Sequence, residues 1–219
     1  MEQNTPESFG RFVGTVETKW LSDGRRMQLL QSFTYIDSKE VEWVAPVDSI
    51  IDGASIPQLL WSIIGSPFTG KYRDASIIHD VACDQKLRPS AEVHEAFHNA
   101  MRASDVDIIQ ALVMYGAVYH FGPSWPVKIT ELVPESRVEV RFSEIQSRFV
   151  ALGSQVSMNK EATNLMPNDQ HDNPYSCVSF DITPPEKNLQ ESDFTQLMLD
   201  IQEKKLSLDD IRNYHPNHL

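Results

Sequence analysis

Ile51-Asp52-Gly53-Ala54-Ser55-Ile56-Pro57 is the stretch at which the apolar pattern of the chain changes. Upstream of it apolar residues tend to alternate with polar ones, and downstream they recur at helical spacing. Gly53 permits a tight or left-handed turn, Ser55 can cap a following helix, and Pro57 suits a first helical turn. The stretch therefore predicts a passage from strands to helices.

The part of the chain before this stretch has the pattern of strands. Residues 11–20, 27–37 and 40–45 show imperfect period-two spacing of aromatic and aliphatic side chains. Asp23-Gly24 and Asp37-Ser38-Lys39 supply turn residues between them. We expect a small antiparallel β-meander.

The part after the stretch has the pattern of helices. One short helix is predicted over residues 59–64 and ends at Gly65. Three longer ones are predicted over residues 72–85, 90–103 and 105–121. Strands first and helices afterwards predict an α+β domain rather than a parallel α/β sheet.

A shift of composition near residue 150 divides the chain into a domain over residues 1–150 and a tail over residues 151–219. Residues 151–190 are rich in Asn, Ser, Pro and Gln, which predicts a linker or a loosely ordered arm. From residue 151 onward eleven acidic residues face five basic ones. We therefore expect an acidic and partly disordered tail.

Two short amphipathic helices are predicted in the tail, between residues 192 and 214. Phe194, Leu197 and Ile201 stand at helical spacing, and Ser207-x-x-Asp210 approximates a capping box. Such elements either dock on their own domain, bind a partner protein, or form a frayed terminus.

Charge and composition exclude several classes of protein. The net charge of −12 disfavours nucleic acid and anionic lipid as partners. No apolar run approaches the about 20 residues that span a membrane, and the first ten residues do not resemble a secretory signal. We expect a protein of the host cytoplasm or of a virion. Cys83 and Cys177 form no C-x-x-C pair, so we expect two reduced thiols.

Histidines and carboxylates are concentrated in the helical block. Four of the seven histidines, His79, His94, His98 and His120, lie there. His94-Glu95-Ala96-Phe97-His98 is a formal H-E-x-x-H, in which both imidazoles could bind one metal ion beside an activating glutamate. The sequence offers no third ligand for such a site. The alternative is a helix whose histidines flank a buried apolar face.

A second candidate site combines the His79-Asp80 pair with the strand-to-helix stretch. If that stretch folds back against His79, then Asp52, His79, Asp80 and His94 can bind a divalent ion, most readily zinc. Asp52, Ser55 and Asp80 are then the candidate catalytic groups, as base or site hydroxyl. The alternative for Asp80 and His79 is a buried hydrogen-bond network without catalysis.

From about residue 9 to residue 125 the chain resembles the phage and prophage family called domain of unknown function 1353 (DUF1353). The resemblance rests most on the six residues Asp-Gly-Ala-Ser-Ile-Pro at 52–57, followed by His79-Asp80. Cys83 replaces an aromatic residue of the family pattern, and His94 stands where the family usually has Asp. The resemblance implies a small α+β domain and a phage-related setting, without an established activity or a match to the tail.

Two functions follow from these residues and this resemblance. The first is a metal-dependent hydrolase that acts on cell-wall peptide or a similar amide or ester. The second is a non-enzymatic virion or assembly protein whose acidic tail, through residues 192–214, binds a partner protein. A weaker third is an inhibitor of a basic host factor.

Overall fold

The computed structural model describes residues 9–53, 70–162 and 175–216. The chain forms two compact units, each of which is described by itself below. The first comprises Met1–Gln85, Val93–Pro123 and Lys187–Leu219, and the second comprises Lys86–Glu92 and Ser124–Glu186. Ser55 and the helix predicted over residues 59–64 lie outside the described residues.

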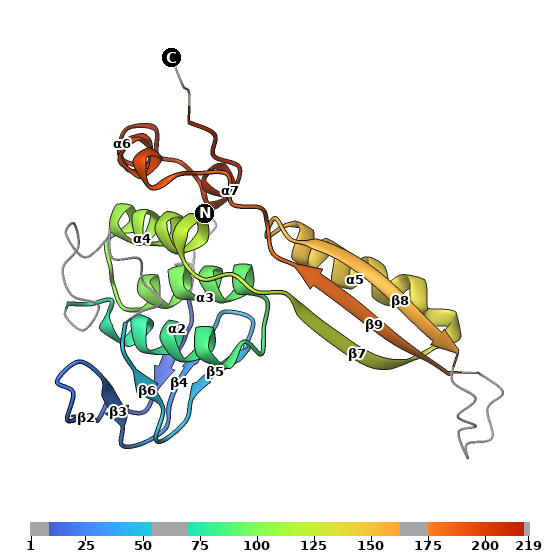
Figure 1. The fold of residues 1–219 in the computed structure, drawn as a ribbon, viewed down its shortest axis with the longest axis horizontal. Helices are drawn as coiled ribbons and strands as arrows, with labels where there is room; N and C mark the ends of the chain where they lie inside the picture. Colours follow the sequence, from blue (N-terminus) through green and yellow to red (C-terminus); the bar gives the residue numbers. More distant parts are fainter. Residues whose placement is uncertain (1–8, 54–69, 163–174, 217–219) are drawn as a thin grey trace, which may run out of the picture. The chain divides into compact units, whose positions relative to one another are not determined.

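The first unit begins with two antiparallel three-stranded sheets (Figure 1). One has the order β1-β4-β5, formed by β1 (Arg11–Val13), β4 (Phe33–Ile36) and β5 (Glu42–Ala45). The other has the order β2-β3-β6, formed by β2 (Thr18–Trp20), β3 (Met27–Leu29) and β6 (Ile50–Ile51).

The predicted antiparallel strands are confirmed, but the strands expected over residues 11–20 and 27–37 are each two strands in different sheets. The first break lies at Gly14, whose φ of 92° belongs to the left-handed region that glycine adopts at little cost. Residues 14–17 separate β1 from β2, and this interruption does not show in the spacing of apolar side chains.

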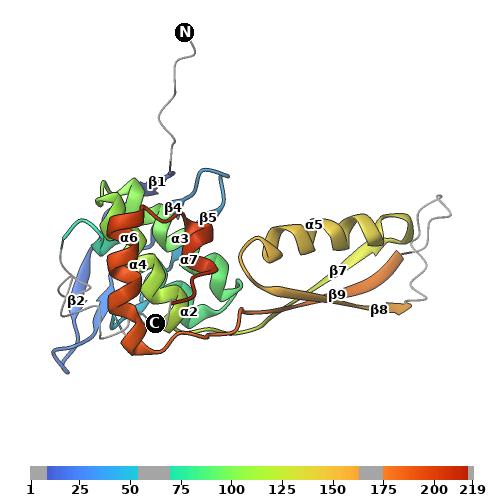
Figure 2. The ribbon, with the colours of Figure 1, turned by 90° about the horizontal axis from the view of Figure 1, so that it is seen from above.

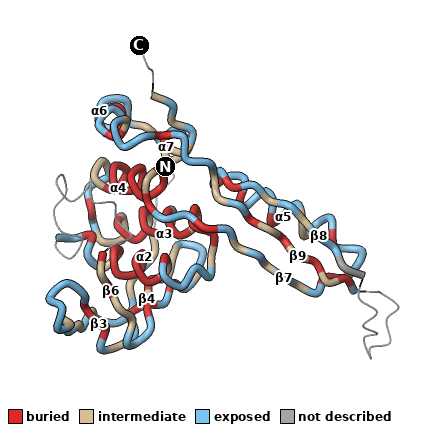
Figure 3. The backbone as a smooth tube through the Cα atoms, in the orientation of Figure 1, coloured by how far each residue is buried: buried red, intermediate tan, exposed pale blue. Residues whose placement is uncertain are grey.

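Three helices pack beside these sheets in the first unit. They are α2 (Arg73–Gln85), α3 (Ser90–Ala103) and α4 (Ile108–Phe121), within one to three residues of the predicted starts. Asp107 caps α4 by accepting hydrogen bonds from the N–H groups of Ile109 and Gln110. Figure 3 shows α4 buried along most of its length, which identifies it as the centre of the helical layer.

The predicted tail helices are confirmed as α6 (Phe194–Lys204) and α7 (Leu208–Arg212), and both pack on α4. Their apolar residues Leu197, Ile201 and Ile211 are fully buried. These side chains fit because Gly116 of α4 has no side chain, and a Cβ there would lie 3.3 Å from Leu197 Cδ2. The amphipathic faces are therefore covered within the first unit itself.

The second unit is a three-stranded antiparallel sheet with one helix along a face (Figure 2). Its strands are β7 (Val127–Pro134), β8 (Gln155–Ala162) and β9 (Tyr175–Thr183), in the order β7-β9-β8, and α5 (Val138–Val150) packs on them.

The structure differs from the linker expected over residues 151–190, because β8 and β9 lie within it. Every second residue of β9 is buried: Ser176, Val178, Phe180 and Ile182. Residues 151–190 have the mixed composition of a loop, but the alternation of buried and outward-facing residues along β9 is that of a half-buried strand. Residue 150, where composition predicts a boundary, is the last residue of α5 and lies inside the second unit.

The described elements make an α+β protein, as the order of strands and helices predicts. None of its described helices combines the length and the apolar character that a membrane crossing requires.

Candidate functional site: a buried histidine and cysteine cluster

The site is built on α2, a helix that is buried on most of its faces. It packs against β4, β5 and β6, so that Ile77, Ile78 and Val81 are at most 4% exposed. His79 and Asp80 are buried in the same helix, at 1% and 3% exposure. Burying a polar side chain costs free energy unless the side chain forms a hydrogen bond. His79 and Asp80 each have a different hydrogen-bond partner.

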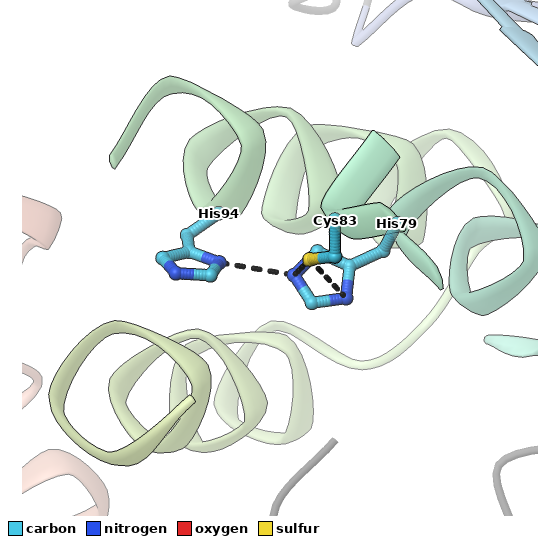
Figure 4. Close-up of side chains that lie close together, drawn as sticks. All are labelled: His79, Cys83 and His94. Atoms are coloured by element: carbon cyan, nitrogen blue, oxygen red, sulfur yellow. Dashed lines mark hydrogen bonds between the residues drawn. The ribbon is translucent and has the colours of Figure 1, made fainter. Parts of the chain in front are cut away.

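His79 faces Cys83 of its own helix and His94 of α3 (Figure 4). Residues four apart lie on one face of a helix, which brings the Cys83 Sγ to 3.6 Å from His79 Nε2. His79 Nε2 is also 3.0 Å from His94 Nδ1. The three candidate ligand atoms all lie within 4.8 Å of one another, and all three residues are buried.

The hydrogen bonds of the two rings determine where their protons are. His94 Nε2 lies 3.0 Å from the carbonyl oxygen of Pro123, which can only accept, so the proton is on Nε2. His94 Nδ1 therefore carries a lone pair, and His79 Nε2 donates to it. Metal-binding histidines commonly donate their second N–H to a backbone carbonyl in this way, which orients the lone pair of the other nitrogen.

The spacing of these atoms is close to that of a tetrahedral zinc site. Zinc bonds of about 2.1 Å to nitrogen and about 2.3 Å to sulfur place ligands at about 3.4 Å (N to N) and about 3.6 Å (N to S). The observed separations are 3.0 Å for the two nitrogens and 3.6 Å for His79 Nε2 and Cys83 Sγ. The third separation, between His94 Nδ1 and Cys83 Sγ, is at most 4.8 Å.

Burial keeps both imidazoles neutral. It holds the pKa of His79 well below its ordinary value, with a further contribution from His94. It lowers the pKa of His94 to about 3, although the Pro123 carbonyl opposes the shift. Neutral imidazole is the form that binds metal ions, and His79 offers Nε2 as a ligand once its proton moves from Nε2 to Nδ1 or is released.

Lys187 is the cationic side chain that acts on this cluster. Its Nζ donates to the carbonyl of Gly122, the residue before Pro123. Burial lowers the pKa of Lys187, and the charge of Cys83 partly reverses that shift. The ammonium group therefore favours the thiolate form of Cys83 and disfavours further positive charge on His94.

Asp80 connects α2 to the strand-to-helix stretch. Its Oδ2 accepts hydrogen bonds from the backbone N–H groups of Asp52, at 2.9 Å, and Gly53, at 3.1 Å. Gly53 has φ of 70°, so glycine is required for the turn that aims both N–H groups at one oxygen. Asp80 thus holds the described start of that stretch, Asp52 and Gly53, against α2, and the expected contact of the stretch with His79 stays a prediction.

The H-E-x-x-H string does not form one site. His98 Nδ1 lies 3.1 Å from Asn99 Oδ1, and the ring packs edge-on against Tyr115. Glu95 forms an ion pair with Arg212 of α7. Among the described residues, His94 clusters with His79 and Cys83 instead.

Of the predicted ligands, the structure brings His79 and His94 together. The roles assigned to Asp52, Ser55 and Asp80 stay predictions, and the described cluster of ligand atoms includes none of them. The sequence reasoning missed Cys83, which it treated as an ordinary thiol. The signal available was the spacing His79-x-x-x-Cys83 on a predicted helix, which places an imidazole and a thiol on one face.

Comparison with known proteins places this cluster inside a recognised domain. Residues 27–118 match the model of the family described as "Protein of unknown function (DUF1353)", a range that contains His79, Cys83 and His94. No solved structure matches the chain.

Two relatives come from Sinorhizobium fredii (strain NBRC 101917 / NGR234). "Uncharacterized protein y4jT" is 38% identical over 136 residues, which cover 61% of this chain and 40% of that protein. "Uncharacterized protein y4iH" is 39% identical over 103 residues, which cover 47% of this chain and 43% of that protein. The matched segment thus spans less than half the length of either relative. Residues 27–118, which carry the cluster, thus match the DUF1353 family, as the resemblance in the sequence predicts.

Proposed function

We propose that the protein is a divalent-metal-dependent hydrolase whose metal ion, zinc, binds to His79, Cys83 and His94. The observation that carries the proposal is the convergence of three buried ligand atoms from α2 and α3 within 4.8 Å. One thiolate and two neutral imidazoles suit zinc, whereas magnesium, calcium and manganese prefer oxygen ligands.

Hydrolysis is the chemistry that three protein ligands support. A tetrahedral ion with three such ligands keeps a fourth position for water, and binding to zinc lowers the pKa of that water to about 7. When bound, the ion would supply an activated water for attack on an amide or ester. Asp80 fixes the backbone of Asp52, which we propose as the base beside the metal, with Ser55 as a site hydroxyl. Cell-wall peptide is the substrate class that the phage-related setting suggests.

A second candidate function follows from the burial of the ligands. His79, Cys83 and His94 are exposed by only 1%, 4% and 2%, and structural metal sites are closed in this way. In this case the ion stabilises the domain, and the protein is a non-enzymatic virion or assembly protein. Residues 192–214 would bind its partner through their outer, acidic side, where the side chain of Asp209 is 78% exposed.

Metal content tests both candidates at once. Protein purified without chelator should contain one zinc ion per chain, and cobalt in its place should give the absorption band of a thiolate ligand. Cys83→Ser should remove that band and weaken zinc binding by about a hundredfold. Cys177→Ser, at a half-buried thiol of the second unit, is the matched control and should bind zinc normally.

Absence of bound metal from folded wild-type protein would contradict both candidates. Where zinc is bound, hydrolysis of amide or ester substrates that stops on chelation supports the hydrolase. Zinc that raises the unfolding temperature without any hydrolysis supports the structural site.

A further inference from the structure

A second group of polar atoms lies on α3, one turn after the metal cluster. His98 Nε2 and Arg102 Nε are both buried and have no hydrogen-bond partner in the described structure. Buried polar atoms are nearly always paired, so an unpaired one calls for an unseen ligand or water. Here two occur four residues apart, on one face of one helix.

The surroundings of this pair are positively charged. Arg102 forms no ion pair with any described residue, although its guanidinium group covers the ring of Phe9 at 5.4 Å. Arg102 and Arg212 both act on His98 as positive charges, and burial together with them lowers the pKa of His98 to about 4. Glu95 neutralises Arg212 through its ion pair, whereas Arg102 lacks such a partner. The excess charge at this place is therefore that of Arg102.

The groups that face His98 come from every element packed around it. Asn99 and Arg102 belong to α3, Tyr115 of α4 contacts the ring edge-on, and Arg212 comes from α7. Phe9, before β1, packs against the same ring at 6.4 Å. None of these contacts supplies a hydrogen-bond partner for His98 Nε2.

The hydrogen bonding of His98 indicates which chemistry fits. Its Nδ1–H donates to Asn99 Oδ1, so in the neutral ring Nε2 carries a lone pair and accepts. Arg102 Nε–H can only donate. A ligand that satisfies both must offer a donor to His98 and a negative acceptor to Arg102.

We propose that His98 and Arg102 bind a phosphate group, either inorganic phosphate or a phosphomonoester. Near neutral pH a phosphate carries both P–OH and P–O⁻ groups, because its second pKa lies close to that range, at about 6 for a phosphomonoester. The P–OH donates to His98 Nε2, and a P–O⁻ oxygen accepts from Arg102 Nε. A carboxylate or sulfate has no proton to donate at this pH, so it would leave His98 unsatisfied. This site is separate from the metal cluster and does not depend on it.

Calorimetric titration of the full chain with inorganic phosphate at pH 7, and with sulfate as the matched anion, tests the proposal. Phosphate should bind, and sulfate should bind at least about tenfold more weakly. Arg102→Met should weaken phosphate binding by about tenfold or more. Arg25→Gln makes the same change of net charge at an exposed residue and should leave binding unchanged.

Three results would overturn the proposal. Folded wild-type protein that binds no phosphate would indicate an ordered water only. Equal affinity for phosphate and sulfate would contradict the proton donated to His98. Unchanged binding by Arg102→Met would remove the guanidinium from the site.

If that variant does not fold, ¹⁵N resonances of the His98 ring in the wild type decide, since Nε2 must shift with phosphate and not with sulfate. Phosphomonoesters tested next distinguish a metabolite from free phosphate.

Discussion

Asp80 and His79 are neighbours in the sequence, but their side chains form hydrogen bonds with different partners. His79 faces the cluster with His94 and Cys83, whereas Asp80 binds the backbone of Asp52 and Gly53. Consecutive residues on a helix project about 100° apart, so a buried helix can hold two polar contacts in different directions. The His-Asp pair thus joins the cluster to the turn that follows β6.

We predict that Asp80→Ala lowers the free energy of unfolding by about 3 kcal/mol, because two backbone N–H groups lose a charged acceptor. Urea unfolding followed by circular dichroism measures the change. Glu139→Ala, at an exposed position of α5, is the matched control and should change stability by less than about 0.5 kcal/mol. A loss below about 1 kcal/mol for Asp80→Ala would show that water replaces the carboxylate.

The helices that carry the cluster could be predicted at the level of elements, because their apolar spacing and their caps are local signals. Helix α4, for example, begins at Ile108 behind its cap Asp107, three residues after the start predicted at residue 105. The partners of His79 could be predicted only in part. His94 is 15 residues away on another helix, and its approach depends on how α2 and α3 pack. Cys83 was within reach of the sequence through its helical spacing alone.

The docking of α6 and α7 on α4 depends on a single small residue. Gly116 leaves the space that Leu197 and Ile211 fill, at 3.3 Å and 3.4 Å from the position of a Cβ. Helix α7 adds polar contacts to the same surface, since Arg212 Nε donates to the Tyr115 hydroxyl at 2.9 Å and His120 Nε2 to the Ile211 carbonyl at 2.7 Å. Apolar fit and polar contacts thus coincide at one place on α4.

Gly116→Leu should release this pair of helices. A leucine side chain cannot share the space with Leu197, so the tail helices must move away. We expect trypsin to cleave after Lys204 or Lys205 faster than in the wild type by about tenfold. Gln110→Leu, at a half-exposed position of α4, should leave the cleavage rate unchanged. Equal rates for Gly116→Leu and wild type would contradict the packing described.

At the scale of the whole chain, the second unit interrupts the first. Residues 124–186 lie between Pro123, whose carbonyl oxygen contacts His94, and Lys187, which donates to the carbonyl of Gly122. Composition along the sequence cannot show such a return, because residues 187–216 follow a Pro- and Asn-rich stretch and yet pack in the first unit. This is why the acidic tail could be recognised from the sequence, whereas its place in the fold could not.

The four buried histidines of the first unit predict how stability depends on pH. Burial lowers the pKa of His79, His94, His98 and His120 below the ordinary value of 6.5. Below pH 6.5 the unfolded chain therefore binds protons that the folded chain does not, and stability falls as the pH falls. The loss continues until the folded-state values are reached, about 4 for His98 and about 3 for His94.

The expected slope is about 1.4 kcal/mol per pH unit for each histidine that stays unprotonated in the folded state over this range. Since domains of this size are stable by about 5 to 15 kcal/mol, metal-free protein should lose its first unit near pH 5. Urea titrations between pH 7 and pH 5, followed by tryptophan fluorescence, measure the slope.

Carboxylates with lowered pKa values, such as Glu131, titrate below this window and do not contribute to it. His120→Gln should reduce the slope by about a quarter. A stability that stays constant from pH 7 to pH 5 would mean that the histidines take up protons in the folded state, which is incompatible with their burial.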